Sequence, residues 1–374
     1  MTKILIFIPW FDPAFKAGGP IQSITNLVHQ FDQEVSYFIF CSNKDVDGSI
    51  LLDIDENCWV DYNDCTKVWY CAVPNPIAIA KKIVAIEKPD VIFTIGLFSW
   101  QYNILPNLLF QANRKIISVR GMLHPGALSQ KTIKKKIFLA VFKLLRLQHQ
   151  AIFHCTNSDE ELHVKNIFGQ QVKTKVADNF PKKLTAKLVA HKFPEKLVMM
   201  TIALISPMKN HLLTLQALKS FDAQITYHIV GAIKDNQYWA ECQKIIEGLP
   251  NNIKVIYHGE VSPHFIAEYL EQTQIFIMPS KSENYGHAII EALIMGKPVI
   301  TSFFTPWKNL EQGLAGMNVD CDAQHIALAI NHFAQMEQST YDVWCEAAIN
   351  YANDKINYEH LHQQYRSLFF NLDA

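Results

Sequence analysis

Short apolar segments alternate with helical patterns along almost the whole of this 374-residue chain. Segments such as Val91–Ile95 and Ile275–Met278 lack the polar residue at every second position that a half-exposed strand would have. Continuous apolar strands are typical of a parallel sheet that is covered on both faces. Strands of this kind that alternate with helices predict doubly wound α/β domains.

The alternation is interrupted once, where a lysine-rich segment with Pro194 at residues 182–196 follows Asn179-Phe180-Pro181 and indicates a linker. Because 374 residues exceed the usual size of one hydrophobic core, we expect one domain at residues 1–180 and another at 181–354. Strands are expected at residues 4–8, 35–41, 68–71, 91–95, 116–119, 151–155, 173–176, 197–203, 226–230, 254–257, 275–278 and 298–301. Helices are expected at residues 20–31, 77–87, 101–111, 132–146, 159–168, 211–221, 236–249, 263–272, 286–295, 323–335, 341–352 and 358–370.

Composition excludes several classes of protein. With 34 basic and 35 acidic side chains, the net charge of −1 argues against a general nucleic-acid binder. The eight cysteines are scattered, with no Cys-x-x-Cys pair and no zinc-ligand spacing, which suits free thiols in the cytosol. The apolar N-terminal segment is shorter than a signal peptide and ends at Pro9, so a buried first strand is expected. These features predict a cytoplasmic protein.

Residues 279–301 hold the densest group of candidate functional residues. A polar turn follows an apolar strand and opens a helix near Gly286, with Glu283 before the helix and Glu291 inside it. Helix N-termini bind phosphate, whereas carboxylates accept hydrogen bonds from sugar hydroxyls. The segment therefore predicts a site for a nucleotide sugar.

The string Ser-x-x-Glu-x-x-Gly-x-x-x-x-Glu-Ala-x-x-x-Gly-x-Pro-Val in this segment resembles the C-terminal signature of glycosyltransferase family 4. That family comprises retaining enzymes of the GT-B fold, which has two Rossmann-like doubly wound domains facing a central cleft. The resemblance implies that Glu283 contacts the transferred sugar, that Glu291 holds the ribose diol, and that N–H groups near Asn284, Tyr285 and Gly286 hold the diphosphate. It also implies that the first domain binds the acceptor, that the second binds the donor, and that the C-terminal helix, about residues 355–374, packs back on the first.

Two further segments carry the resemblance. Gly18 and Gly19 follow the first strand, where two glycines allow a ligand to approach the backbone, and the family has a glycine-rich loop there that lines the cleft. Lys209 lies in Ser206-Pro-Met-Lys, which resembles the family's Arg-x-Ser-Pro-x-Lys and implies a cation for the leaving diphosphate. Leu204 stands where the family has arginine, so Lys209 acts alone or another cation, such as Arg120 or Lys281, replaces that arginine.

Arg120-Gly-Met-Leu-His124 ends a strand of the first half and resembles a bacterial subgroup of the family that builds surface polysaccharides. Arg120 and His124 are therefore candidates to contact the sugar or phosphate near the anomeric carbon, while a structural histidine is the alternative. Gly231, after the strand at 226–230, is expected to let the backbone approach the nucleotide, and Asn179 to mark the domain boundary. Ordinary turn chemistry is the alternative for both.

Three Asp-x-Asp pairs, Asp45/Asp47, Asp53/Asp55 and Asp320/Asp322, resemble the metal-binding signature of the GT-A fold. None follows a strand in the right context, so they are interpreted as polar loops and no metal or other cofactor is expected. Residues 131–146 form a basic amphipathic segment. It is either a core-facing helix with a solvated lysine face or a contact with anionic membrane lipid, which would suit a lipid-linked acceptor.

Together these features predict a glycosyltransferase that moves a hexosyl or N-acetylhexosaminyl group from a UDP- or GDP-linked sugar. The acceptor is expected to be a hydroxyl of a glycan or lipid-linked oligosaccharide, as in lipopolysaccharide or capsule synthesis. A nucleotide-sugar epimerase of the same fold, and a non-catalytic partner subunit that binds nucleotide sugar, remain alternatives. A nicotinamide dehydrogenase is disfavoured because Gly-x-Gly-x-x-Gly does not follow the first strand.

Overall fold

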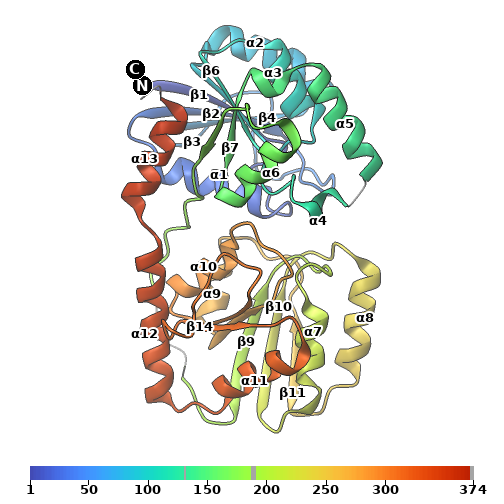
Figure 1. Cartoon of the computed structure of the whole chain (residues 1–374), viewed down its shortest axis with the longest axis vertical. Helices are drawn as coiled ribbons and strands as arrows, with labels where there is room; N and C mark the ends of the chain where they lie inside the picture. The colour runs from blue at the N-terminus through green and yellow to red at the C-terminus, as the bar shows by residue number, and fades with distance from the viewer. Residues whose placement is uncertain (130–131, 187–190, 371–374) are drawn as a thin grey trace. The chain divides into compact units, whose positions relative to one another are not determined.

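The computed structural model describes residues 1–129, 132–186 and 191–370. The chain divides into two compact units (Figure 1). The first comprises Met1–Phe180 and the C-terminal segment that begins at Tyr358, and the second comprises Pro181–Asn357. Three predicted segments extend beyond the described residues, namely the basic segment at Lys131, the linker at residues 187–190 and the C-terminal segment at residues 371–374.

The described part of the first unit is built on one eight-stranded sheet. Its strands are β1 (Thr2–Phe7), β2 (Val35–Ser42), β3 (Val60–Asn63), β4 (Thr66–Cys71), β5 (Val91–Ile95), β6 (Arg114–Ser118), β7 (Ile152–Cys155) and β8 (Thr174–Val176). The order is β3-β4-β2-β1-β5-β6-β7-β8, and all neighbours are parallel except β3 and β4. The order reverses between β1 and β5, where Ile4 pairs with Val91. Sheets of this kind bind ligands beyond the carboxyl ends of the strands at such a reversal.

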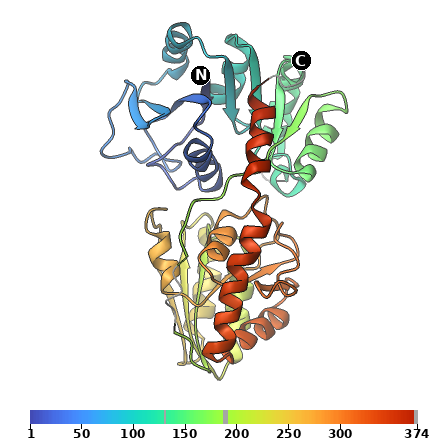
Figure 2. The ribbon, with the colours of Figure 1, turned by 90° about the vertical axis from the view of Figure 1, so that its left-hand side faces the viewer.

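The helices of the first unit include one from the C-terminal end of the chain. They are α1 (Gly19–Gln30), α2 (Pro76–Glu87), α3 (Leu105–Leu109), α4 (Pro125–Leu128), α5 (Thr132–Leu144), α6 (Ser158–Phe168) and α13 (Tyr358–Phe369), with short turns η1 (Trp100–Ile104) and η2 (Leu147–His149). α13 packs against the sheet of this unit (Figure 2). The Arg114 guanidinium donates to the Ser367 and Leu368 carbonyls at the end of α13, at 3.0 and 2.6 Å, and the ring of Phe369 contacts that of Phe93.

The second unit has a parallel sheet of six strands within the described residues. Its strands are β9 (Lys196–Ile202), β10 (Gln224–Val230), β11 (Ile253–Tyr257), β12 (Ile275–Met278), β13 (Val299–Ser302) and β14 (Gly316–Val319). Its helices are α7 (His211–Ala217), α8 (Asn236–Glu247), α9 (Ile266–Glu271), α10 (His287–Ile294), α11 (Ala323–Ala334) and α12 (Gln338–Lys355), with the short turn η3 (Leu218–Ser220). The order β11-β10-β9-β12-β13-β14 reverses between β9 and β12.

Both faces of the second sheet are buried. Ile275 and Ile277 of β12 lie in one hydrophobic cluster, with residues of α8 and α11, whereas Phe276 and Met278 lie in another, with residues of α9 and α10. This division follows from the alternation of side chains along a strand. The continuous apolar strands therefore have the environment that the sequence predicted, and the doubly wound α/β class is confirmed.

Some elements escaped prediction because their sequences are short or polar. β3 is a partly exposed Val-Asp-Tyr-Asn segment, β14 begins with a glycine, and α4 has only four residues. The single helix predicted at residues 101–111 is instead the π-helical turn η1 followed by α3, with Pro106 in the first turn of α3. The helix predicted at residues 211–221 ends at Ala217 and continues as a 3-10 turn.

Candidate functional site

Two predicted site residues meet where the second sheet reverses its order. Lys209 lies in the loop after β9, and Glu283 lies in the loop after β12. Their side chains form an ion pair in which the Lys209 Nζ donates to the Glu283 Oε1, and they are 22% and 10% exposed. An ammonium has three donors and a carboxylate two acceptor oxygens, so both groups keep capacity for a ligand.

Backbone and amide contacts hold these two loops together. The Asn210 side chain donates to the Pro279 carbonyl at 3.0 Å, and the Lys281 amide donates to the Met208 carbonyl at 2.9 Å. Asn210 adopts a left-handed conformation with φ of 66°, which asparagine tolerates better than most residues. The position of Lys209 relative to Glu283 is therefore set by the backbone as well as by the ion pair.

Gly286 forms the turn that opens α10. Its φ is 78°, and a Cβ added there would lie 3.3 Å from the Trp307 Nε1, which donates to the Tyr285 carbonyl at 2.6 Å. A side chain at this position would therefore be strained and crowded. Asn284 and Tyr285 directly precede the turn, so the predicted diphosphate-binding residues lie at the N-terminus of α10, where helices bind anions.

Glu291 lies on α10 and is buried, with 7% of its surface exposed. Burial raises the pKa of its carboxyl from 4.5 to about 7, although the positive charge of Lys182 opposes this shift. A carboxyl with this pKa is partly protonated near neutral pH, so it can both donate and accept hydrogen bonds with hydroxyl groups. The sequence located this residue but gave no indication of its burial.

The structure gives Gly231 a role in the fold. Its φ is 145°, and a Cβ added there would lie 2.0 Å from the Ala203 carbonyl oxygen, in the loop after β9. Its amide also donates to the Gly259 carbonyl at 2.8 Å. The need for glycine here thus follows from the close approach of two loops, and contact with a nucleotide stays a prediction.

In the first unit, Gly18 ends the loop between β1 and α1, at the point where the first sheet reverses, and Gly19 is the first residue of α1. We refer to residues 15–19 as the glycine loop. Gly18 precedes α1 with φ of 70°, and a Cβ added at either glycine would meet no atom within 4 Å. The loop therefore has open space on the side that a side chain would occupy.

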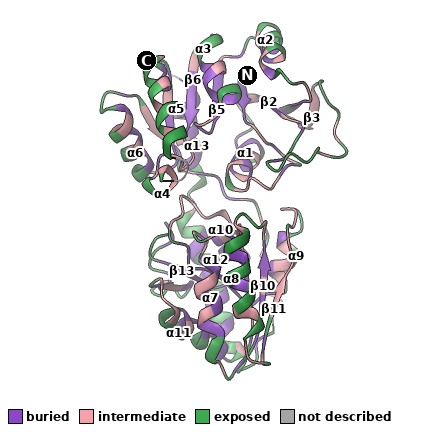
Figure 3. Ribbon diagram, turned by 90° about the vertical axis from the view of Figure 1, so that its right-hand side faces the viewer, coloured by how far each residue is buried: buried purple, intermediate pink, exposed green. Residues whose placement is uncertain are grey.

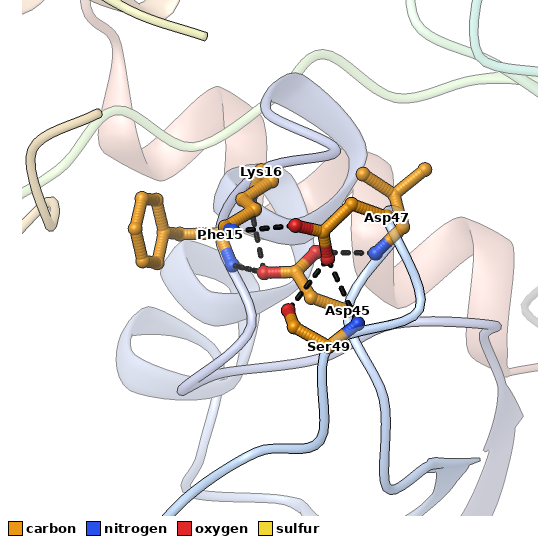
Figure 4. Close-up of polar contacts among 6 residues, drawn as sticks. Phe15, Lys16, Asp45, Asp47 and Ser49 are labelled. Atoms are coloured by element: carbon orange, nitrogen blue, oxygen red, sulfur yellow. Dashed lines mark hydrogen bonds and ion pairs between the residues drawn. The ribbon is translucent and has the colours of Figure 1, made fainter. Parts of the chain in front are cut away.

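Two aspartates hold the glycine loop in place (Figure 4). Asp45 is 4% exposed, and its carboxylate accepts hydrogen bonds from the Phe15 and Lys16 amides at 2.9 and 3.2 Å. Asp47 pairs with the Lys16 Nζ at 2.6 Å and accepts from the Ser49 hydroxyl at 2.5 Å. The sequence identified this pair as a polar loop but missed its contacts with the glycine loop. Nothing in the local pattern indicates them, because they depend on the tertiary placement of residues 45–49.

Arg120 points into the interior of the first unit. Its Nη1 donates to the Asn179 Oδ1, which brings together two residues that the sequence singled out. Its charge reaches the buried His154, whose pKa falls to about 3 mainly through burial and further through the Arg120 charge. Arg120 thus ties the turn after β6 to the end of the first unit, and a contact with sugar or phosphate stays a prediction.

His124 caps the short helix α4. Its Nδ1 accepts a hydrogen bond from the Gly126 amide at 3.1 Å, so the neutral ring carries its proton on Nε2. Its ring meets that of His163 edge to face, with centroids 5.3 Å apart. The buried Glu160, which sequence reasoning missed, accepts hydrogen bonds from the amides of Gly121 and Thr156 and so fixes the turn that leads to His124.

Metal sites and membrane spans were sought in the described residues alone. In residues 1–129, 132–186 and 191–370 we find no group of three His, Cys, Asp or Glu side chains placed to bind a metal ion. No helix in the same ranges is long and apolar enough to cross a membrane. All eight cysteines are free thiols.

Residues 185–350 match the family model of glycosyl transferases group 1. This part of the chain is similar to that family. The match contains Lys209 and Glu283, which form the ion pair at the β9–β12 reversal, and Glu291, which lies on α10. The match supports the prediction of a glycosyltransferase.

Solved structures show the same fold over the whole chain. Sucrose-phosphate synthase from Thermosynechococcus elongatus is 18% identical, covers 99% of both chains and has a TM-score of 0.72. HepE from Anabaena, in complex with UDP and glucose, is 17% identical, covers 98% of this chain and 99% of its own, and has a TM-score of 0.70. These likenesses confirm the GT-B fold of two Rossmann-like domains. The sulfoquinovosyl transferase SQD2 of Arabidopsis thaliana is 26% identical over 89 residues, which span 24% of this chain and 17% of that protein.

Proposed function

We propose that this chain is a retaining glycosyltransferase of the family 4 type. It moves a hexosyl or N-acetylhexosaminyl group from a UDP- or GDP-linked sugar to a hydroxyl of a glycan or lipid-linked oligosaccharide in surface-polysaccharide synthesis. The observation that carries this proposal is the Lys209–Glu283 ion pair at the strand-order reversal of a group 1 domain. The complex of the structural neighbour HepE with UDP and glucose supports a nucleotide-sugar donor.

The proposed reaction proceeds on one face of the sugar. The bond from the anomeric carbon to the diphosphate oxygen breaks, the acceptor oxygen bonds to the same carbon, and the departing phosphate takes the acceptor's proton. Lys209 and the N-terminus of α10 stabilise the negative charge that develops on the diphosphate. Because Glu283 is ion-paired with Lys209, it is better suited to hold sugar hydroxyls than to attack the anomeric carbon.

The proposal includes no metal ion. Asp45 and Asp47, the first Asp-x-Asp pair of the chain, engage backbone amides, Lys16 and Ser49. The charge of the diphosphate is instead balanced by Lys209 and by the helix terminus. We further propose that the enzyme acts in the cytoplasm, in peripheral contact with the anionic inner face of the membrane, where lipid-linked acceptors are found.

The test begins with the donor. Nucleotide sugars are screened for protection against thermal unfolding, since a ligand that binds the folded state raises the apparent stability. The best donor is then incubated with and without a lipid-linked or glycan acceptor while nucleotide release and sugar products are measured. Product that forms only with acceptor, and with unchanged anomeric configuration, supports the proposal. A changed sugar epimer that forms from donor alone would show an epimerase instead.

Variants of the ion pair test the assigned residues. Lys209→Ala and Glu283→Ala are each expected to lower turnover by about 10²–10³-fold. The matched control is Lys244→Ala, at an exposed position on α8, which should retain normal turnover. Near-normal turnover in either ion-pair variant would show that the assignment is wrong.

A further inference from the structure

α5 (Thr132–Leu144) exposes an apolar face that a helix on a protein surface would normally bury. Phe138 and Phe142 pack into the core of the first unit, whereas Ile133, Ile137 and Leu144 are 75%, 60% and 81% exposed. At 3.6 residues per turn, these three positions lie within about 40° of one another around the helix. They point to the side opposite Phe142, and Figure 3 shows exposed residues along this helix. We call Ile133, Ile137 and Leu144 the outer stripe of α5.

The outer stripe is flanked by basic residues. Lys134, Lys136 and Lys143 are exposed on the same helix, and Arg146 is exposed just after it. The apolar side chains of the outer stripe lie between these charges and are exposed to solvent. A helix with an apolar stripe between rows of lysine or arginine is the arrangement that lies in the interface of an anionic membrane.

The charge of the surrounding sequence is also one-sided. Residues 91–158 contain nine lysines and arginines but no aspartate or glutamate. In the whole chain roughly one residue in eleven is acidic, so a segment of 68 residues would hold about six acids at the average frequency. The chain therefore keeps negative charge out of the sequence that surrounds α5, as binding to an anionic surface requires.

A tryptophan lies beside the helix. Trp100 is half exposed, and its ring meets that of Phe138 at a centroid distance of 5.7 Å. Tryptophan combines a large apolar ring with one N–H donor, and it is enriched where proteins meet the membrane interface. Trp100 thus lies next to α5 and exposes an aromatic ring beside that helix.

We propose that the outer stripe, together with Trp100, is a docking surface for anionic lipid bilayers. The stripe enters the headgroup region with α5 parallel to the membrane plane, and Lys134, Lys136, Lys143 and Arg146 contact lipid phosphates. Binding itself needs no transfer reaction. Its use, which is to bring a lipid-linked acceptor to the enzyme, rests on the proposed function.

Cosedimentation with vesicles tests the surface in the full-length protein. The vesicles contain phosphatidylcholine alone or a mixture with phosphatidylglycerol, and each is assayed at low and at high salt. We expect binding to the anionic vesicles at low salt, much weaker binding at high salt because ions screen the lysines, and little binding to phosphatidylcholine. Equal binding to both vesicle types, or no binding to either, would overturn the proposal.

Two variants separate the apolar and the electrostatic contributions. Ile137→Glu and Lys136→Glu are each expected to weaken vesicle binding about tenfold or more. Their matched controls in the second unit are Leu328→Glu, which is 60% exposed on α11, and Lys244→Glu on α8, and both should bind as the wild type does. Equal losses in variants and controls would mean that net charge, and no particular surface, drives the binding.

Unfolding and self-association are measured separately from vesicle binding. Unfolding by urea checks that Ile137→Glu leaves stability close to that of wild type, as expected for an exposed side chain. Sedimentation velocity without lipid checks for self-association, and a dimer that Ile137→Glu dissociates would overturn the proposal by assigning the stripe to a second copy of the chain. Vesicle binding without any transferase activity would leave this inference standing and contradict the proposed function.

Discussion

Replacing Glu291 with glutamine is expected to raise the stability of the protein and to weaken nucleotide binding. Glu291 is buried, and the pKa of its carboxyl is raised from 4.5 to about 7, chiefly because burial disfavours the charged form. Between these two pH values the folded chain keeps a proton that the unfolded chain has released. Burial of this group therefore costs little stability well below pH 4.5. The free energy of unfolding falls as the pH rises from about 4.5 to 7, and the loss is complete above about pH 7.

The size of the effect follows from the shift in pKa. The two pKa values differ by about 2.5 units, and each unit corresponds to 1.36 kcal/mol, so the ionised carboxylate costs about 3 kcal/mol of folding free energy at pH 8. Glutamine has nearly the same shape and no charge to bury. The stability difference between Glu291→Gln and wild type should thus be near zero below about pH 4 and approach about 3 kcal/mol at pH 8.

Binding should change in the opposite direction. Hydrogen bonds from ribose hydroxyls to a charged carboxylate are stronger than those to an amide, so Glu291→Gln is expected to bind the nucleotide about tenfold more weakly. Urea unfolding of both proteins over a range of pH, and calorimetric titration with nucleotide, measure the two effects. Glu346→Gln, at an exposed position on α12, is the control and should change neither. A variant no more stable than wild type at pH 8 would contradict the buried-charge argument, and unchanged affinity would contradict the ribose assignment.

Two other predictions concern contacts around the candidate sites. In a double-mutant cycle, the losses of turnover caused by Lys209→Ala and Glu283→Ala should not add, because the two side chains are in direct contact; additive losses would mean that they act independently. Asp45→Asn, which keeps one acceptor oxygen for the amides of the glycine loop, should retain more activity than Asp45→Ala, whose KM for acceptor or donor should rise severalfold. Asp55→Ala, at an exposed position, is the control for this comparison. Equal kinetics in Asp45→Ala and wild type would show that the contact of Asp45 with the Phe15 and Lys16 amides does not position the glycine loop.

The sequence was most informative where one physical rule decides the structure. Continuous apolar strands require cover on both faces, so β5 and β12 were located to the residue. The two carboxylates and the glycine around α10 were found because their spacing along one chain segment is fixed by the turn and the helix. Contacts between distant parts of the chain were not predicted. The contacts of Asp45 with the glycine loop and of Glu160 with Gly121 join residues 29 or more positions apart, and no local pattern indicates them.

The orientation of α5 shows a second reason why sequence patterns are incomplete. Its segment has apolar residues on two opposite sides, and helical periodicity does not determine which of them packs on the core. The phenylalanines face inward and the isoleucines face outward. From the sequence, α5 was either a core-facing helix with a solvated lysine face or a contact with membrane lipid. In the structure the helix has a buried apolar face and also an exposed apolar stripe between lysines.

Leu204 stands where family 4 has an arginine. The second positive charge at the proposed diphosphate site must therefore come from another residue. Arg120, one candidate to replace it, is bonded to Asn179 inside the first unit, which makes it poorly suited to this task. Lys281 is better placed, because its amide is bonded to the Met208 carbonyl, directly beside Lys209, and its side chain is exposed.

We therefore expect Lys281 to supply the second cation. Lys281→Ala should weaken binding of the nucleotide diphosphate about fivefold to tenfold, should affect the nucleoside monophosphate less, and should be partly rescued by Lys281→Arg. Calorimetric titration of the three proteins with both nucleotides measures this, with Lys244→Ala as the control for loss of a distant positive charge. Equal losses of affinity for diphosphate and monophosphate would show that Lys281 acts only through the net charge of the unit. In that case Lys281 would not replace the arginine that is absent at position 204.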